Sequence, residues 1–157
     1  MTEFVFEREM TIPRPLAEVF PFFADAENLE ALTPPWLHFR ILTPTPIPMA
    51  VGTLIEYEIR FRGMPIRWRT KITDWEPPHR FVDEQLSGPY RQWIHEHTFT
   101  ETADGTRMKD VVRYAVLGGR LVNRLFVASE VERIFEYRTE RLREIFADSK
   151  DTLSPTA

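Results

Sequence analysis

The stretches LIEYEIRF (Leu54–Phe61) and IRWRTKITDW (Ile66–Trp75) lie on either side of a short segment that contains Gly63 and Pro65. In both stretches apolar and polar residues alternate, which is the period of a β-strand with one buried and one solvated face. A glycine and a proline between two such runs are typical of a tight turn. The two stretches therefore predict a hairpin of an antiparallel sheet.

Similar short runs, separated by prolines and glycines, extend along most of the chain. Asp104 and Gly105 predict a tight hairpin turn between the last two of them. A sheet of six or seven antiparallel strands follows from this pattern. Besides the first hairpin, we expect strands in the ranges 2–12, 37–42, 80–86, 91–101 and 106–116.

Two short helices are predicted directly after the first strand. Residues 16–23 have apolar side chains at helical spacing and follow Pro15, which is tolerated in the first turn of a helix. Asp25 is a suitable N-cap for a second helix over residues 26–32. The prolines at 34 and 35 should end that helix, because proline removes a backbone donor and restricts the residue before it.

The C-terminal part of the chain predicts one long amphipathic helix. Apolar residues recur three or four positions apart from Val127 to Phe146. Ser129 and Glu132 have the spacing of a capping box, so we expect a separate short helical piece over residues 120–127 before the main helix.

These elements predict an α+β fold in a single domain over residues 1–147, followed by a frayed polar tail at 148–157. The apolar face of a curved antiparallel sheet must be covered, and the terminal helix is the only predicted element long enough to cover it. We expect the sheet to wrap around this helix and to enclose a pocket for an apolar small molecule. The 12 Phe, 4 Trp and 4 Tyr supply large side chains that can line such a pocket.

Composition and charge exclude several classes of function. The net charge is −4 with acidic and basic residues interspersed, so no broad basic surface is available for nucleic acid. No apolar run reaches the length of a membrane span. There is no cysteine, and therefore no disulfide or thiolate chemistry. Glu3 and Glu7 lie where a signal peptide needs a basic start, so we expect a cytoplasmic protein.

The segment RFVDEQLSGPYRQWIHEHTF (Arg80–Phe99) combines large aromatic and polar side chains on the same strand faces. If the aromatic residues point inward, the polar ones do too, and buried polar groups require partners, water or a ligand. One predicted strand carries Phe81, Asp83 and Gln85 on a shared face, and its neighbour carries Trp93, His95, His97 and Phe99.

Other elements can add polar groups to this cluster. Asp110 and Tyr114 share a face of the last predicted strand. Arg138 interrupts the apolar stripe of the long helix, where it can pair with Asp83 or Asp110. The alternative is that the stem of Arg138 packs on the core while its guanidinium reaches water.

The histidines and aspartates of this cluster can have chemical or simply structural roles. Two histidines at positions i and i+2 are often satisfied structural side chains. Metal binding by His95, His97 and Asp83 is conceivable, but the spacing is unspecific and we expect no metal. The chain has no glycine-rich phosphate loop, no nucleophile elbow and no HExxH motif, and we expect no cofactor.

Four stretches of the chain have a recognisable combination of motifs: LTPPWLHFRI (Leu32–Ile41), the whole range Gly52–Phe99, the aspartate and tyrosine of DVVRYAV (Asp110–Val116) and IFEYR (Ile134–Arg138). Together with the order of elements, these motifs resemble bacterial members of the SRPBCC superfamily, the START-like helix-grip proteins. The similarity is to the ligand-binding subgroup described beside polyketide cyclases and dehydrases, sometimes found next to or fused with sugar-nucleotide epimerase-like proteins. The chain departs from the subgroup at residues 117–119, LGG, where a proline-containing turn is usual.

The resemblance implies a helix-grip fold with a deep cavity for lipids, sterols, polyketides or quinones, in proteins that range from carriers to cyclases to accessory factors. Our leading hypothesis is non-catalytic binding of a hydrophobic or aromatic molecule. We expect Tyr57, Trp68, Phe81, Trp93 and Phe99 to form the walls of the cavity. We expect the polar end of the ligand to be oriented by Asp83, Gln85, His95, His97, Tyr114 and Arg138.

Two other hypotheses remain open. The first is a cyclase or dehydratase in which His95 or His97 shuttles a proton and an aspartate, Asp83 or Asp110, sets its tautomer. The second is an accessory domain that docks onto a protein partner through the loop Thr43–Met49.

Overall fold

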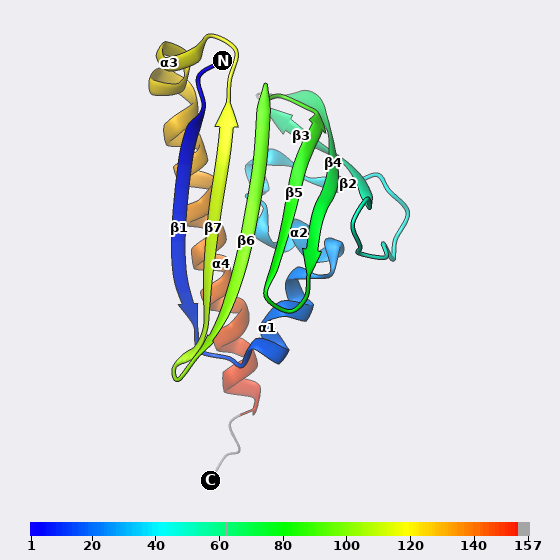
Figure 1. The fold of residues 1–157 in the computed structure, drawn as a ribbon, viewed down its shortest axis with the longest axis vertical. Helices are drawn as coiled ribbons and strands as arrows, with labels where there is room; N and C mark the ends of the chain where they lie inside the picture. The colour runs from blue at the N-terminus through cyan, green and yellow to red at the C-terminus, as the bar shows by residue number, and fades with distance from the viewer. Residues whose placement is uncertain (62, 154–157) are drawn as a thin grey trace.

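One antiparallel sheet of seven strands forms the main layer of the molecule (Figure 1). The computed structural model describes the backbone of residues 1–61 and 63–153 and the side chains of residues 1–61 and 63–147. The strands lie in the order β1-β7-β6-β5-β4-β3-β2, so β1 pairs with the last strand of the meander. They are β1 (Phe4–Ile12), β2 (Arg40–Ile41), β3 (Leu54–Phe61), β4 (Met64–Glu76), β5 (Arg80–Ser87), β6 (Gln92–Thr102) and β7 (Gly105–Ala115).

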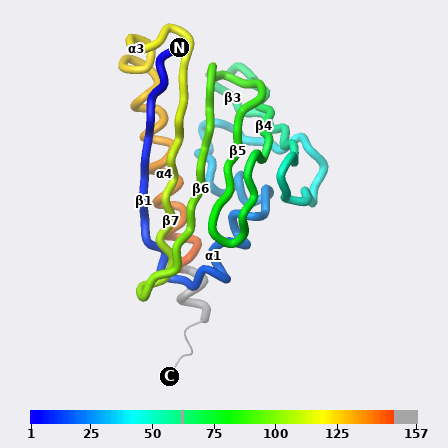
Figure 2. Tube along the Cα trace, in the orientation of Figure 1, coloured from blue at the N-terminus to red at the C-terminus, as the bar shows by residue number. Residues whose placement is uncertain are grey.

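The helices lie on one face of this sheet. The long helix α4 (Ala128–Leu153) runs behind β1 and β7, as Figures 1 and 2 show. Between β1 and β2 lie α1 (Leu16–Phe23), a 3₁₀ turn at Ala26–Asn28 and α2 (Leu29–Leu32). The expected α+β architecture is therefore confirmed: a curved antiparallel sheet, two short helices after the first strand and a long terminal helix.

Apolar side chains from α4 and the sheet form the core. Val131, Phe135 and Leu142 are almost fully buried, and the Phe135 ring lies 4.8 Å from that of Phe6 on β1. The second half of α4 packs with α1 in a cluster that includes Phe146. Burying each of these large side chains stabilises the fold by about 1.5–3 kcal/mol.

The predicted hairpin is confirmed by β3 and β4, whose residues pair from Leu54↔Lys71 to Phe61↔Met64. The expected strand over residues 37–42 is mostly wrong. A 3₁₀ turn at Pro35–Leu37 comes first, and only Arg40–Ile41 pairs with β3. The physical reason is His38, whose φ of 48° lies in the left-handed region and interrupts an extended chain.

The helical segment before α4 also differs from expectation. It consists of α3 (Gly119–Val122) and a π turn at Asn123–Val127, and it continues into α4 without a break at Ser129. Ser129 therefore lies inside a helix, where the backbone donors have partners, so the expected capping box has no helix end to cap. Gly118 starts this helix with a φ of 89°, and a Cβ there would lie 2.2 Å from Cγ2 of Val122. The turn therefore requires glycine.

The helix α4 extends to Leu153, so the backbone of residues 148–153 is helical where a frayed tail was expected. The remaining residues of that expected tail, 154–157, lie outside the described part of the chain. No helix in the described part is both long enough and apolar enough to cross a membrane.

Candidate functional site

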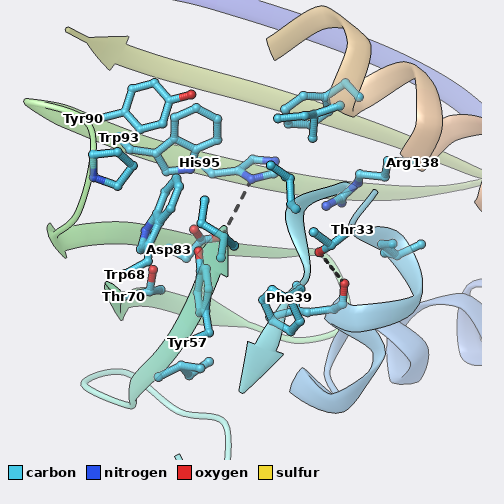
Figure 3. A pocket seen from close by; sticks show the side chains of 18 of the residues that line it. Thr33, Phe39, Tyr57, Trp68, Thr70, Asp83, Tyr90, Trp93, His95 and Arg138 are labelled. Carbon is cyan, nitrogen blue, oxygen red and sulfur yellow. Dashed lines mark hydrogen bonds and ion pairs between the residues drawn. The ribbon is translucent and has the colours of Figure 1, made fainter. Parts of the chain in front are cut away.

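A cavity of about 430 Å³ lies between the sheet and the helices. Its walls come from β3, β4, β5 and β6, from α2, and from the π turn and α4 (Figure 3). Of the residues expected to form a binding site, eight line this cavity: Tyr57, Trp68, Phe81, Asp83, Trp93, His95, His97 and Arg138.

One side of the cavity is built of aromatic rings. Tyr57 and Trp68 are cross-strand partners, and their rings stack at 5.6 Å with an interplanar angle of 23°. Trp93 on β6 meets Trp68 edge-on at 5.5 Å. Tyr90 packs against Trp93 at 4.6 Å and also lines the cavity, although we did not predict it. Four aromatic side chains thus form an apolar wall suited to an aromatic or hydrocarbon ligand.

Strand pairing brings two aspartates and two histidines together deeper in the sheet. His95 is the partner of Asp83 on β5, and His97 is the partner of Asp110 on β7. Nε2 of His97 lies 2.7 Å from Oδ2 of Asp83, and Nε2 of His95 lies 2.7 Å from Oδ1 of Asp110. Nδ1 of His97 also lies 3.3 Å from Oδ1 of Asp110.

Arg138 completes this network from the opposite side, on α4. Its Nη2 donates a hydrogen bond to Oδ1 of Asp110 at 3.2 Å, and the residue is only 8% exposed. Of the two pairings expected from the sequence, the one with Asp110 is therefore formed. The alternative position of Arg138, with its guanidinium in water, is wrong.

The network determines the protonation of its members. Burial alone would raise the pKa of Asp110, but the charge of Arg138 and the hydrogen bonds from both histidines hold that pKa well below its usual range. Burial opposes ionisation of Asp83 in the same way, yet the hydrogen bond from His97 and the neighbouring positive charges lower its pKa. Two carboxylates therefore remain ionised in the interior.

The two histidines behave differently from one another. Burial would lower the pKa of His97, but its bonds to Asp110 and Asp83 outweigh burial and raise that pKa. Burial and the charge of His97 together lower the pKa of His95 in spite of Asp110. When His97 is protonated, it and Arg138 balance the two aspartates, so that four charged groups are accommodated in one interior.

Asp83 is the member of this network that is most accessible from the cavity. Its side chain is 20% exposed, against 2–10% for those of Asp110, the two histidines and Arg138. Figure 3 shows Asp83 beside the hydroxyl of Tyr57, within the aromatic wall. Burial and the charge of Asp83 raise the pKa of Tyr57, so its phenol stays protonated. Asp83 is therefore the carboxylate that lies beside the aromatic wall, in a cavity whose lining also includes Asp25 and Glu130.

Asp83, His95 and His97 form the one group of three potential metal ligands found among the described residues, and each offers a ligand atom within 4.8 Å of the others. The geometry does not favour metal binding, because the two imidazole rings stack at 3.7 Å and 27°. Nitrogen lone pairs lie in the ring plane, so those of stacked rings run side by side instead of converging on one ion. The hydrogen bonds described above explain these residues without a metal.

Three of the expected site residues lie outside the cavity. The amide of Gln85 holds the backbone of Tyr90, with Nε2 donating to its carbonyl at 2.7 Å and Oε1 accepting from its N–H at 3.2 Å. Phe99 is 2% exposed and packs in the core against Phe20. The hydroxyl of Tyr114 donates to Oδ1 of Asn123 at 2.9 Å. All three support the fold around the cavity instead of lining it.

The chain matches a family model over residues 3–147, and the family is described as polyketide cyclase / dehydrase and lipid transport. The chain belongs to this family. The description of the family therefore supports hydrophobic molecules as the general class of ligand for the cavity. It covers both enzymes and lipid carriers. A search of curated proteins gave no match.

Solved structures with low sequence identity share the fold. Protein Ms6760 from Mycobacterium smegmatis is 17% identical with a TM-score of 0.69, and 92% of each chain is covered. Protein CV1439 from Chromobacterium violaceum is 14% identical with a TM-score of 0.71, over 90% of this chain and 96% of that one. A nucleoside-diphosphate sugar epimerase from Corynebacterium glutamicum is 22% identical with a TM-score of 0.67, over 88% of this chain but only 28% of its own.

Proposed function

We propose that this protein binds a hydrophobic or aromatic small molecule, such as a lipid, a polyketide or a quinone, in the internal cavity. The observation that carries this proposal is a cavity of about 430 Å³ with an aromatic wall and the ionised carboxylate of Asp83 beside it (Figure 3). Cavities that bind small ligands are mostly apolar, with a few polar groups that fix orientation. The family to which the chain belongs supports the same class of ligand.

The arrangement of polar groups suggests how the ligand is oriented. Its apolar part would contact Tyr57, Trp68 and Trp93, whose rings form one wall. Its polar end would lie beside Asp83, and because this carboxylate is ionised, it accepts hydrogen bonds. A ligand with a hydroxyl group at one end of an apolar body fits both requirements.

A fluorescence titration with N-phenyl-1-naphthylamine, which emits strongly in apolar surroundings, tests the proposal. Ile134 lines the cavity from α4, and Ile134→Trp places a larger, aromatic side chain there. We expect the wild-type protein to bind the probe and Ile134→Trp to bind it about tenfold more weakly, a loss of about 1.4 kcal/mol. Leu86→Trp, on an exposed position outside the cavity, is the matched control. Equal binding by all three proteins would refute binding in the cavity.

Catalysis of proton transfer is a second candidate, because His97 contacts Asp83 and Asp110 through its two ring nitrogens. A histidine held between two carboxylates can pass a proton to or from a ligand at Asp83. The test uses 2-tetralone in D₂O, where loss of a proton beside the carbonyl and its replacement by deuterium is measured by mass spectrometry. Exchange that is faster than in buffer and absent in His97→Gln would favour an enzyme. Binding of 2-tetralone without faster exchange would favour a carrier.

A further inference from the structure

Three connections of the chain lie at the same end of the molecule, the upper end in Figure 1. They are the β3–β4 hairpin, the β5–β6 turn and the corner between β7 and α3, because β3, β5 and β7 all run toward this end of the antiparallel sheet. Figure 2 shows the same arrangement of the backbone. Cavity-lining residues come from all three connections: Phe61, Pro89 and Leu117. The cavity therefore reaches this end of the molecule.

Large apolar side chains are exposed at this end. The corner between β7 and α4 carries Leu117, Leu121 and Leu125 at intervals of four residues, followed by Phe126, and each is at least 54% exposed. Met64 of the β3–β4 hairpin is 70% exposed. We call these five residues the apolar rim. Scattered surface leucines are ordinary, but a group of large apolar side chains around a cavity indicates an interaction surface.

The charge of this end differs from that of the whole chain. The protein has 20 basic and 24 acidic residues, yet the segments 60–69, 86–93 and 116–127 contain arginines and no acidic residue. Arg120 and Arg124 are both exposed and alternate with the leucines of the rim. At the opposite end, the β6–β7 turn region carries Glu101 and Asp104. Nearby acids at the rim end are Glu3 on the N-terminal segment and Glu130 at the start of α4.

We propose that the apolar rim docks on the surface of a lipid bilayer that contains anionic lipids. Leucine and phenylalanine side chains enter the boundary between headgroups and acyl chains, while arginines at the same level contact lipid phosphates. Two observations favour a lipid surface over a protein partner. Residues 117–126 carry the exposed leucines and phenylalanine of the rim with two exposed arginines and no acidic residue, and two rim residues, Leu117 and Phe126, also line the cavity. Docking in this orientation places the cavity end against the bilayer, where apolar ligands are exchanged without crossing water.

Flotation with vesicles tests the proposal on the full chain. Vesicles of phosphatidylcholine alone are compared with vesicles that also contain phosphatidylglycerol, at low and high salt. We expect binding to the anionic vesicles that weakens with salt. Arg120→Ala/Arg124→Ala should weaken it about 25-fold, because each basic residue near an anionic surface contributes roughly a factor of five. Leu121→Ser/Leu125→Ser should weaken it at both salt concentrations.

The matched control is Arg141→Ala/Arg143→Ala, which removes the same charge from α4 away from the rim. Binding that falls equally in this control would overturn the proposal, because it would reflect net charge alone. Absence of vesicle binding would also overturn it. If the protein instead self-associates, and Leu121→Ser/Leu125→Ser abolishes this, the rim is an interface between two copies. Probe binding in the cavity is measured separately on every variant, so failure of docking is distinguishable from failure of the proposed function.

Discussion

Nη2 of Arg138 lies 3.2 Å from Oδ1 of Asp110, and this contact joins the middle of α4 to the middle of β7. Both side chains are almost fully buried, at 10% and 2% exposure. The same Oδ1 atom accepts from His95, so the aspartate is held by an element on each side of the cavity. The pair therefore fixes the position of the long helix relative to the residues that face the ligand.

Arg138→Met should destabilise the protein by about 3 kcal/mol or more, because it leaves the charge of Asp110 buried without its guanidinium partner. Urea unfolding at neutral pH measures this loss. The control is Arg107→Met. Arg107 forms an exposed ion pair with Glu9 at 3.9 Å, and its loss should reduce the free energy of unfolding by less than about 1 kcal/mol. If both variants lose the same free energy of unfolding, the buried network does not stabilise the fold as described.

The stability of the protein should fall as pH rises above about 6.5. The pKa of His97 is raised in the folded protein above its ordinary value of 6.5, so folding binds a proton that the unfolded chain has already lost. This stabilisation is complete below pH 6.5 and is lost as pH rises through the folded value. The lowered pKa of His95 acts only below pH 6.5, where it reduces stability as pH falls.

Urea unfolding between pH 6.5 and 9 checks this dependence. His97→Gln should have a flatter profile than the wild-type protein over this range, since glutamine does not titrate. His79→Gln, the same substitution at an exposed position, is the control. A wild-type profile that rises over this range would contradict the protonation assigned to His97.

Gln85→Ala should destabilise the protein by about 1–2 kcal/mol and also weaken probe binding. The side chain makes two hydrogen bonds to the backbone of Tyr90, which lines the cavity, although Gln85 itself does not. Thermal unfolding and the fluorescence titration measure the two effects. Gln92→Ala, which loses a hydrogen bond to the exposed Glu3, should change neither strongly. Unchanged probe binding in Gln85→Ala would show that the turn is held without this amide.

Phe99→Ala should cost about 3–5 kcal/mol without changing the probe affinity of the folded fraction. Phe99 is 2% exposed and packs on the rings of Phe20 and Phe23 without lining the cavity itself. Its effect on stability is therefore that of a core residue. Denaturation and titration of the same sample separate the two quantities. A loss of probe affinity without a loss of stability would contradict this core role and would show that Phe99 contributes to the cavity wall.

Much of the fold was predictable because its strands alternate cleanly. The runs that became β3 and β4 have one apolar face each, and Asp25 caps the 3₁₀ turn through the N–H of Glu27, as its position suggested. The short strand after Pro35 was not predictable in the same way. Whether a residue such as His38 adopts a left-handed conformation depends on tertiary contacts, and the local pattern does not carry that information.

The sequence predicted which face of the sheet the site residues lie on, but not which of them border the cavity. Alternation correctly placed Asp83, His95 and His97 on the inner side of the sheet. It could not separate the part of that face that borders the cavity from the part that α1 and α4 fill, where Phe99 lies. Tyr90 follows Gly88 and Pro89 in a turn, where no periodicity exists to indicate which way a side chain points.

The central claim is that the cavity holds an apolar small molecule, and native mass spectrometry of the gently purified protein tests it most directly. Any bound compound is then released by denaturing extraction and identified. The account predicts a stoichiometric adduct that is apolar or aromatic and carries a polar group at one end, and that is lost in Ile134→Trp. A wild-type protein that carries no adduct and also fails to take up N-phenyl-1-naphthylamine would contradict it.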